Sequence, residues 1–107
     1  MKTKNAHMTE IQAKATQAVE LLKLLANPTR LVVLCQLISD AKCVGALEEI
    51  VGISQSALSQ HLAKMRAEGI VHTEKIGQQV FYRIADPKVG KILNTLYEIY
   101  CDPREQP

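Results

Sequence analysis

The chain has 107 residues, a length that suits one small domain and leaves no room for two. Hydrophobic residues make up 47% of it and charged residues 22%, which is typical of a globular chain and excludes a disordered one. Thirteen basic against eleven acidic side chains give a net charge of +2, which alone predicts no particular partner. The longest apolar run, Leu31 to Cys35, is far too short for a membrane span, and the polar residues 1–5 do not form a secretory signal. We therefore expect no membrane association and a cytoplasmic protein with reduced cysteines.

The first predicted helix covers residues 9–26. Apolar side chains recur there at helical spacing, at Ile11, Ala15, Ala18, Leu22 and Leu25. Leu21 and Leu24 widen this stripe, which suggests two burying partners, one of them another subunit. Residues 1–8 are expected to form a flexible N-terminal arm.

A helix-turn-helix is predicted next. Pro28 begins a helix of about residues 28–39, with Asn27 as its N-cap and Cys35 on its apolar stripe. After a polar connection at residues 40–42, a short helix covers residues 44–51. Ser54 caps the following helix, residues 54–68, which Gly69 ends. Two helices joined by a tight turn are the helix-turn-helix pattern.

A hairpin and a last helix complete the predicted fold. Residues 70–75 and 79–84 are rich in β-forming side chains and are separated by a turn at Gly77. Asp86 caps a helix whose apolar stripe extends to Tyr100, and residues 102–107 are expected to form a flexible tail. The fold class is therefore mainly α with a small β-hairpin wing. We assign residues 9–101 to one winged helix-turn-helix domain for DNA binding and dimerisation.

The outer face of residues 54–64 predicts a DNA partner. It offers amide, hydroxyl and cationic groups and no carboxylate, the groups that base edges in the major groove accept. Residues 54–83 carry four basic and two acidic side chains, and residues 1–9 carry two basic and none acidic. The side chains expected to contact double-stranded DNA are Ser54, Gln55, Ser56, Ser59, Gln60, Lys64, Lys75, Gln78, Gln79 and Arg83.

Three stretches resemble a known family. Residues 24–31 (LLANPTRL), 54–62 (SQSALSQHL) and 66–71 (RAEGIV) are similar to the ArsR/SmtB family of bacterial winged-helix repressors. The resemblance covers about residues 15–101. It implies a homodimer built from the first and last helices, with two recognition helices that read a palindromic operator.

The metal-binding positions of that family are incomplete here. One family site is a Cys-x-Cys before the recognition helix, where this chain has Cys43 followed by Gly45 in the second position. The other is a set of Asp, His and Glu on the last helix, where residues 88–100 contain no His and only Glu98 is acidic. The sequence therefore predicts no metal site and no cofactor.

Residues 33–37 (VLCQL) and 97–101 (YEIYC) resemble the dithiol, persulfide-sensing branch of the family, the BigR/SqrR/HlyU-like proteins. This resemblance implies that Cys35 and Cys101 meet within one subunit. It also implies that reactive sulfur species oxidise them together and so change the operator affinity of a repressor. Cys43 remains a possible third thiol.

Other interpretations stay open at this point. Cys35 lies on an apolar stripe and is also compatible with a buried small hydrophobe. Thiolates of all three cysteines would suit a repressor that responds to a soft metal or arsenite. An anti-repressor that acts by occluding DNA and a protein-interaction module without DNA activity also remain open. No Ser-His-Asp, paired-carboxylate or phosphate-loop pattern occurs, so we expect no enzyme.

Overall fold

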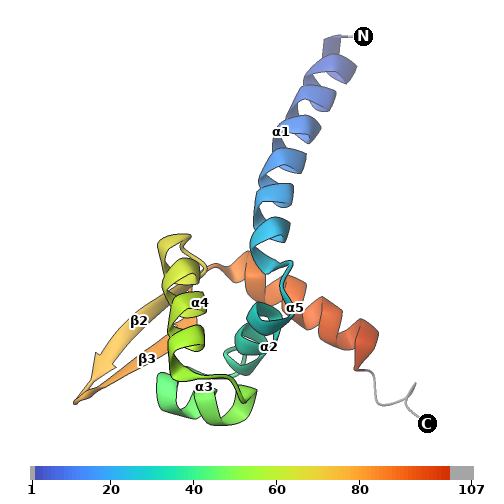
Figure 1. The fold of residues 1–107 in the computed structure, drawn as a ribbon. Coiled ribbons are helices and arrows are strands. Elements are labelled where there is room, and N and C mark those ends of the chain that lie inside the picture. Colours follow the sequence, from blue (N-terminus) through green and yellow to red (C-terminus); the bar gives the residue numbers. More distant parts are fainter. Residues whose placement is uncertain (1, 102–107) are drawn as a thin grey trace.

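The computed structural model describes the backbone of residues 2–101 and the side chains of residues 7–101. Within this part of the chain, five helices and three strands follow one another (Figure 1): α1 (Lys2–Leu25), α2 (Pro28–Gln36), β1 (Lys42–Cys43), α3 (Val44–Val51), α4 (Gln55–Ala67), β2 (Val71–Ile76), β3 (Gln79–Ile84) and α5 (Pro87–Tyr100). The predicted winged helix-turn-helix order is confirmed. The differences concern helix ends and one additional strand, and the predicted tail at residues 102–107 lies outside the described residues.

Local side-chain chemistry starts three of the helices. Asn27, Ser54 and Asp86 accept hydrogen bonds from the backbone N–H groups of Arg30, Ala57 and Lys88 at 3.1, 3.2 and 2.9 Å. These N–H groups belong to first turns, which have no helical partner, so each cap supplies a missing acceptor. All three predicted N-caps are confirmed.

Two glycines make the turns on either side of α4. Gly52 ends α3 with φ 77°, and Gly69 follows α4 with the same φ. A side chain would be strained in this left-handed region, whereas glycine adopts it freely. The turn at Gly52 redirects the chain within three residues, 52–54, from α3 into α4.

The sheet has three antiparallel strands in the order β1-β3-β2. In the hairpin, Val71 pairs with Ile84 and Ile76 with Gln79, while β1 places Lys42 opposite Tyr82 and Cys43 opposite Phe81. The sequence predicts a plain connection where β1 lies, and this prediction is wrong. A two-residue strand has no periodicity of its own and exists because the edge of β3 is available for pairing.

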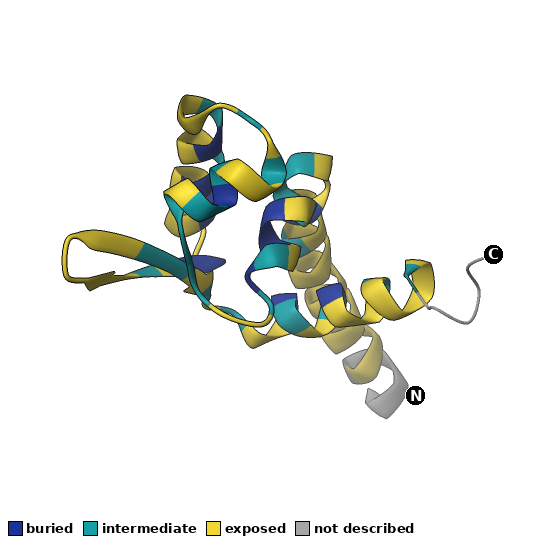
Figure 2. Cartoon of the chain, turned by 90° about the horizontal axis from the view of Figure 1, so that it is seen from below, coloured by how far each residue is buried: buried dark blue, intermediate teal, exposed yellow. Residues whose placement is uncertain are grey.

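The core is aliphatic and draws on every helix. Twelve buried hydrophobic side chains form it: Leu25, Val33, Leu34, Leu37, Leu47, Leu58, Leu62, Met65, Ile70, Val71, Val89 and Leu93. The wing contributes only at its base, and most of the hairpin is exposed (Figure 2). The core thus fixes α4 and the base of the wing, and leaves their outer surfaces free.

The first helix is longer than predicted. It begins at Lys2 and not at Thr9, so residues 2–8, predicted to be a flexible arm, are helical. No Gly or Pro in this segment stops the helix. Every residue from 7 to 20 is exposed, and only the last turn, with Leu21, Leu24 and Leu25, packs on the core. Figure 1 shows α1 projecting from the body. The radius of gyration is 16.9 Å, against about 13 Å for a compact domain of this length.

The second helix is shorter than predicted and ends at Gln36 instead of Ser39. The Gln36 carbonyl accepts a hydrogen bond from Nζ of Lys42 at 2.7 Å, in place of a further helical turn. A cation at this position also suits the negative end of the helix dipole. None of the described helices is long and apolar enough to cross a membrane.

Candidate nucleic-acid interface and dithiol pocket

Helix α4 has one buried and one open face. Leu58, Leu62 and Met65 are buried at spacings of four and three residues, which fixes one side of the helix on the core. The six residues at the start and along α4 that were predicted to contact DNA are all exposed: Ser54, Gln55, Ser56, Ser59, Gln60 and Lys64. The structure therefore leaves this set accessible to a DNA groove.

The charge along α4 also suits a phosphate backbone. No acidic side chain lies in its first turn, and Lys64 and Arg66 lie in its last. The free N–H groups and the positive dipole end at Ser54 attract anions. Both ends of the open face thus favour contact with DNA.

The wing carries the remaining predicted contacts. Lys75, Gln78 and Gln79 lie at or near the hairpin tip and are exposed. Arg83 is exposed as well, but it lies toward the base of the wing, opposite His72 in the strand register. Its Nη2 atom lies 3.5 Å from Oε1 of Glu74. Part of the Arg83 charge is therefore balanced within the wing, while Lys75 forms no salt bridge with any of the described side chains.

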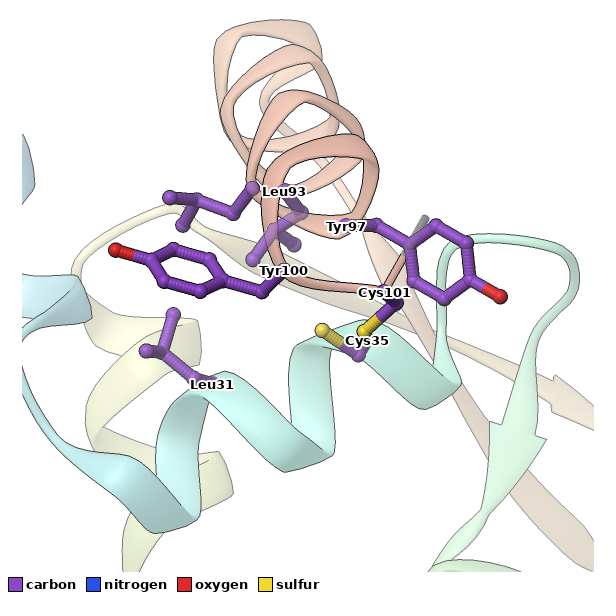
Figure 3. Close-up of a pocket in the computed structure, with 7 residues that line it drawn as sticks. Leu31, Cys35, Leu93, Tyr97, Tyr100 and Cys101 are labelled. Carbon is purple, nitrogen blue, oxygen red and sulfur yellow. The ribbon is translucent and has the colours of Figure 1, made fainter. Parts of the chain in front are cut away.

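Two cysteines that are distant in sequence meet between α2 and α5. Cys35 is the next-to-last residue of α2, and Cys101 is the C-cap of α5. Figure 3 shows their sulfur atoms next to each other, and both residues line the same pocket. Both are free thiols, and the pocket has a volume of about 380 Å³. The two side chains whose proximity the family resemblance implied are thus close together.

Hydrocarbon and aromatic groups form the rest of this dithiol pocket, which we define by Cys35, Cys101 and their neighbours Leu31, Leu93, Leu96, Tyr97 and Tyr100. In Figure 3 the Tyr97 and Tyr100 rings lie on either side of the sulfur atoms, with their hydroxyls directed away. Sequence reasoning did not assign these tyrosines to a site. The available signal was spacing, because Leu93, Tyr97 and Cys101 follow one another at four residues and share a helix face.

The pocket perturbs one thiol. Partial burial raises the pKa of the Cys35 thiol, and the nearby Cys101 raises it further by charge repulsion. Cys35 is an exposed residue, and the side chains that line the pocket shield its thiol from water only in part. The charge repulsion means that the two sulfurs are within electrostatic reach of each other.

Cys43 lies elsewhere. It pairs with Phe81 in the sheet, precedes α3 without a side-chain capping bond, and does not line the dithiol pocket. Within the described part of the chain, no three His, Cys, Asp or Glu side chains are grouped to hold a metal ion. The three-thiolate arrangement that a soft-metal or arsenite response would need is therefore not formed among these residues.

An exposed recognition helix after a tight turn, followed by a β-wing, defines a winged-helix DNA-binding transcription regulator. The profile of the family described as "Bacterial regulatory protein, arsR family" matches residues 27–73. The chain is 39% identical over 102 residues to the biofilm growth-associated repressor of Xylella fastidiosa Temecula1, covering 94% of this chain and 90% of the relative. It is 39% identical over 99 residues to the transcriptional activator HlyU of Vibrio cholerae O1, covering 92% of each. The structure of reduced HlyU from Vibrio cholerae N16961 matches with TM-score 0.82 and 42% identity, over 87% of this chain and 98% of that one.

The chain belongs to the arsR family of bacterial regulatory proteins. It is accordingly a DNA-binding transcription regulator, and the relatives it matches are regulators and not enzymes.

Proposed function

We propose that the chain acts as a homodimeric repressor that releases a palindromic operator when reactive sulfur oxidises Cys35 and Cys101. The observation that carries the proposal is the meeting of these two thiols in one pocket between α2 and α5. The similar HlyU of Vibrio cholerae is described by its redox state, as reduced HlyU, and this supports a redox interpretation.

The DNA contacts in this proposal come from α4 and the wing. The amide and hydroxyl side chains of α4 read base edges in the major groove, and Lys64 and Lys75 approach phosphates. Replacing Lys64 by Gln should weaken binding to all DNA sequences. It should also reduce the slope of log affinity against log salt concentration by about one, because one phosphate contact is lost. Replacing Gln60 by Ala should instead weaken binding to the operator more than binding to unrelated DNA.

The homodimer is supported by the apolar surface of α1. Ile11, Val19 and Leu22 are exposed on a helix whose residues 7–20 all lie outside the core. Ile99 of α5 is exposed as well. An isolated helix of this kind is marginal in water, so packing on a second subunit would stabilise it.

The chemistry needs only the two thiols and a persulfide. One cysteine thiolate attacks the outer sulfur of RSSH, which forms a cysteine persulfide and releases RSH. The other thiol then attacks the cysteine-bound sulfur of that persulfide and releases H₂S. The product is a Cys35–Cys101 disulfide, and the two thiols have been oxidised by the sulfane sulfur. A second RSSH that first extends the persulfide gives a trisulfide bridge instead, with two RSH and one H₂S released.

The bridge would act on DNA binding through α2. It ties the end of α5 to α2, which packs against α3, the first helix of the helix-turn-helix. A small shift of α2 therefore changes the position of α4 in each subunit of the dimer. A coupling free energy of about 1–3 kcal/mol, or roughly 5–150-fold in affinity, is sufficient for such a switch.

Operator binding before and after polysulfide treatment tests the proposal. Fluorescence anisotropy with the DNA upstream of the gene that encodes this chain should show a loss of affinity of roughly 5–150-fold after polysulfide treatment. Cys35→Ser and Cys101→Ser should keep their affinity, and Cys43→Ser is the matched control that should respond like the natural chain. Release of DNA by polysulfide from Cys35→Ser or Cys101→Ser would contradict the dithiol mechanism.

One relative favours a second candidate for the direction of regulation. HlyU of Vibrio cholerae is named a transcriptional activator. A chain that only occupies DNA activates a gene when it displaces another repressor, so the anti-repressor function uses the same interface. In vitro transcription from the bound promoter separates the two, because a repressor lowers the transcript level without any other regulator present.

A further inference from the structure

We propose that the dithiol pocket selects neutral, apolar sulfane-sulfur donors, such as dialkyl trisulfides and polysulfanes, over donors that carry charge. This inference rests on the proposed oxidation of Cys35 and Cys101 and concerns which oxidants reach them. Its first basis is the lining of the pocket: apart from the two thiols, leucine and tyrosine side chains form the walls, and none of the described residues that line it is charged.

The ends of two helices add a second basis. Cys35 lies one residue before the end of α2, and Cys101 is the C-cap of α5, so both sulfurs lie at negative helix ends. Lys42 donates to the Gln36 carbonyl but is paired with Asp40 at 2.6 Å, so this pair adds no net charge. Among the described residues, the pocket lining and the Lys42–Asp40 pair therefore offer no net positive charge to an anionic donor.

The volume of the pocket and the polarisability of sulfur also suit a small apolar donor. A volume of about 380 Å³ is near the lower limit for ligand pockets and suits a small molecule. Divalent sulfur is polarisable and contacts aromatic ring edges favourably, as Tyr97 and Tyr100 would allow. A carboxylate or ammonium group on the donor would instead lose hydration against these walls without gaining a partner.

A trisulfide RS–S–SR gives a balanced reaction. The first cysteine thiolate attacks the central sulfur and displaces one RS⁻, which takes up the proton of that cysteine as RSH. The second cysteine attacks the same sulfur and displaces the other RSH. The product is Cys35–S–S–S–Cys101 with one sulfur inserted, two thiols have been oxidised, and the two outer sulfurs of the donor have been reduced to RSH.

Treatment of the protein with a neutral donor and, separately, with a charged donor tests the selection. Reduced protein is treated separately with dimethyl trisulfide, which is neutral, and with glutathione trisulfide, which carries carboxylates and ammonium groups. Peptide mass spectrometry follows the rate of the Cys35–Cys101 bridge and the rate of modification at Cys43 in the same chain. Cys43 lies outside the pocket and corrects for the intrinsic reactivity of each donor. The corrected rate should be at least about tenfold higher for dimethyl trisulfide.

A charge placed in the wall of the pocket should abolish the preference for neutral donors. Tyr100 is 78% exposed, so Tyr100→Lys changes the pocket without disturbing the core. This variant should lose the preference for dimethyl trisulfide, whereas Tyr100→Leu should keep it. Equal corrected rates for both donors in the natural chain would overturn the selection and leave the proposed function standing. Failure of both donors, and of inorganic polysulfide, to link Cys35 with Cys101 would overturn both proposals.

Discussion

At the scale of single residues, the two proposed sensing thiols do not have the surroundings of an activated cysteine. Reactive cysteines usually lie beside a cation or at a helix N-terminus, which lower the thiol pKa. Cys35 lies near the end of α2 in an apolar pocket, and burial followed by the charge of Cys101 raises its pKa. We therefore expect the Cys35 thiol to react slowly with oxidants at neutral pH unless a donor is held in the pocket.

The raised pKa of Cys35 predicts a pH dependence. Alkylation of Cys35 by iodoacetamide should rise with pH, with a midpoint above that of a thiol in a short peptide. Cys101→Ser should lower the midpoint, because it removes the repulsive charge, but should not restore the peptide value, because burial remains. The free energy of unfolding should not depend on this group below the pKa of the unfolded thiol and should fall as pH rises above it. Mass spectrometry of the alkylated peptide in a Cys43→Ser background measures the midpoint, and a midpoint at or below the peptide value would contradict this explanation.

At the scale of elements, caps and core contacts position α4, and these could be predicted from the sequence. Ser54 at the start, Gly69 at the end and the buried Leu58, Leu62 and Met65 define the helix and its open face. The same local chemistry sets the starts of α2 and α5. What the sequence could not provide was information carried by distant neighbours. Strand β1 exists through pairing with β3, and the end of α2 depends on Lys42, six residues further along.

The Ser54 cap should separate helix stability from DNA binding. Its hydroxyl accepts from the Ala57 N–H at 3.2 Å, so Ser54→Ala should lower the free energy of unfolding by about 1 kcal/mol. Ser54→Asp keeps a capping oxygen and should retain nearly the natural stability. It should nevertheless weaken operator binding, because it places a carboxylate beside phosphates. Urea unfolding and anisotropy titrations measure the two effects, and equal DNA affinity of the natural chain and Ser54→Asp would remove Ser54 from the interface.

The Lys42 contact predicts a link between the wing and the helix that carries Cys35. Its ammonium donates to the Gln36 carbonyl at 2.7 Å and to Asp40 at 2.6 Å, and the hydrogen bond to Lys42 lowers the pKa of Asp40. Lys42→Met keeps the length of the side chain but removes both bonds, and should lower the free energy of unfolding by about 1–2 kcal/mol. Asp40→Asn should change it little, because that carboxyl is exposed. Thermal unfolding compares the two, and equal losses would show that the ion pair, and not the capping of α2, carries the effect.

At the scale of the whole molecule, the pocket and the DNA-binding face share one chain of packed elements. Helix α5 contacts α2, α2 contacts α3, and α3 contacts α4, so the dithiol pocket and the recognition helix are joined through the core. The order of these elements could be predicted from the sequence, but only the folded chain shows that Tyr97 and Tyr100 complete the pocket. Helix α1 stands apart from this arrangement, since its residues 7–20 are all exposed. In the proposed dimer it forms the contact between subunits, which the two-fold symmetry of a palindromic operator requires.

Breaking the α1 surface should therefore separate the subunits and weaken operator binding. Leu22 is 52% exposed on the apolar side of α1, and Ala13, nine residues earlier, lies on the opposite side. Sedimentation should give about twice the chain mass of 11.9 kDa for the natural protein and for Ala13→Glu, the matched control. Leu22→Glu should sediment as a single chain, because a carboxylate at an apolar contact loses its hydration without a partner. Its operator affinity should fall by about 100-fold or more, because the two recognition helices are no longer linked. Circular dichroism confirms that Leu22→Glu remains folded, and a folded Leu22→Glu that still sediments as a dimer would place the subunit contact on another surface.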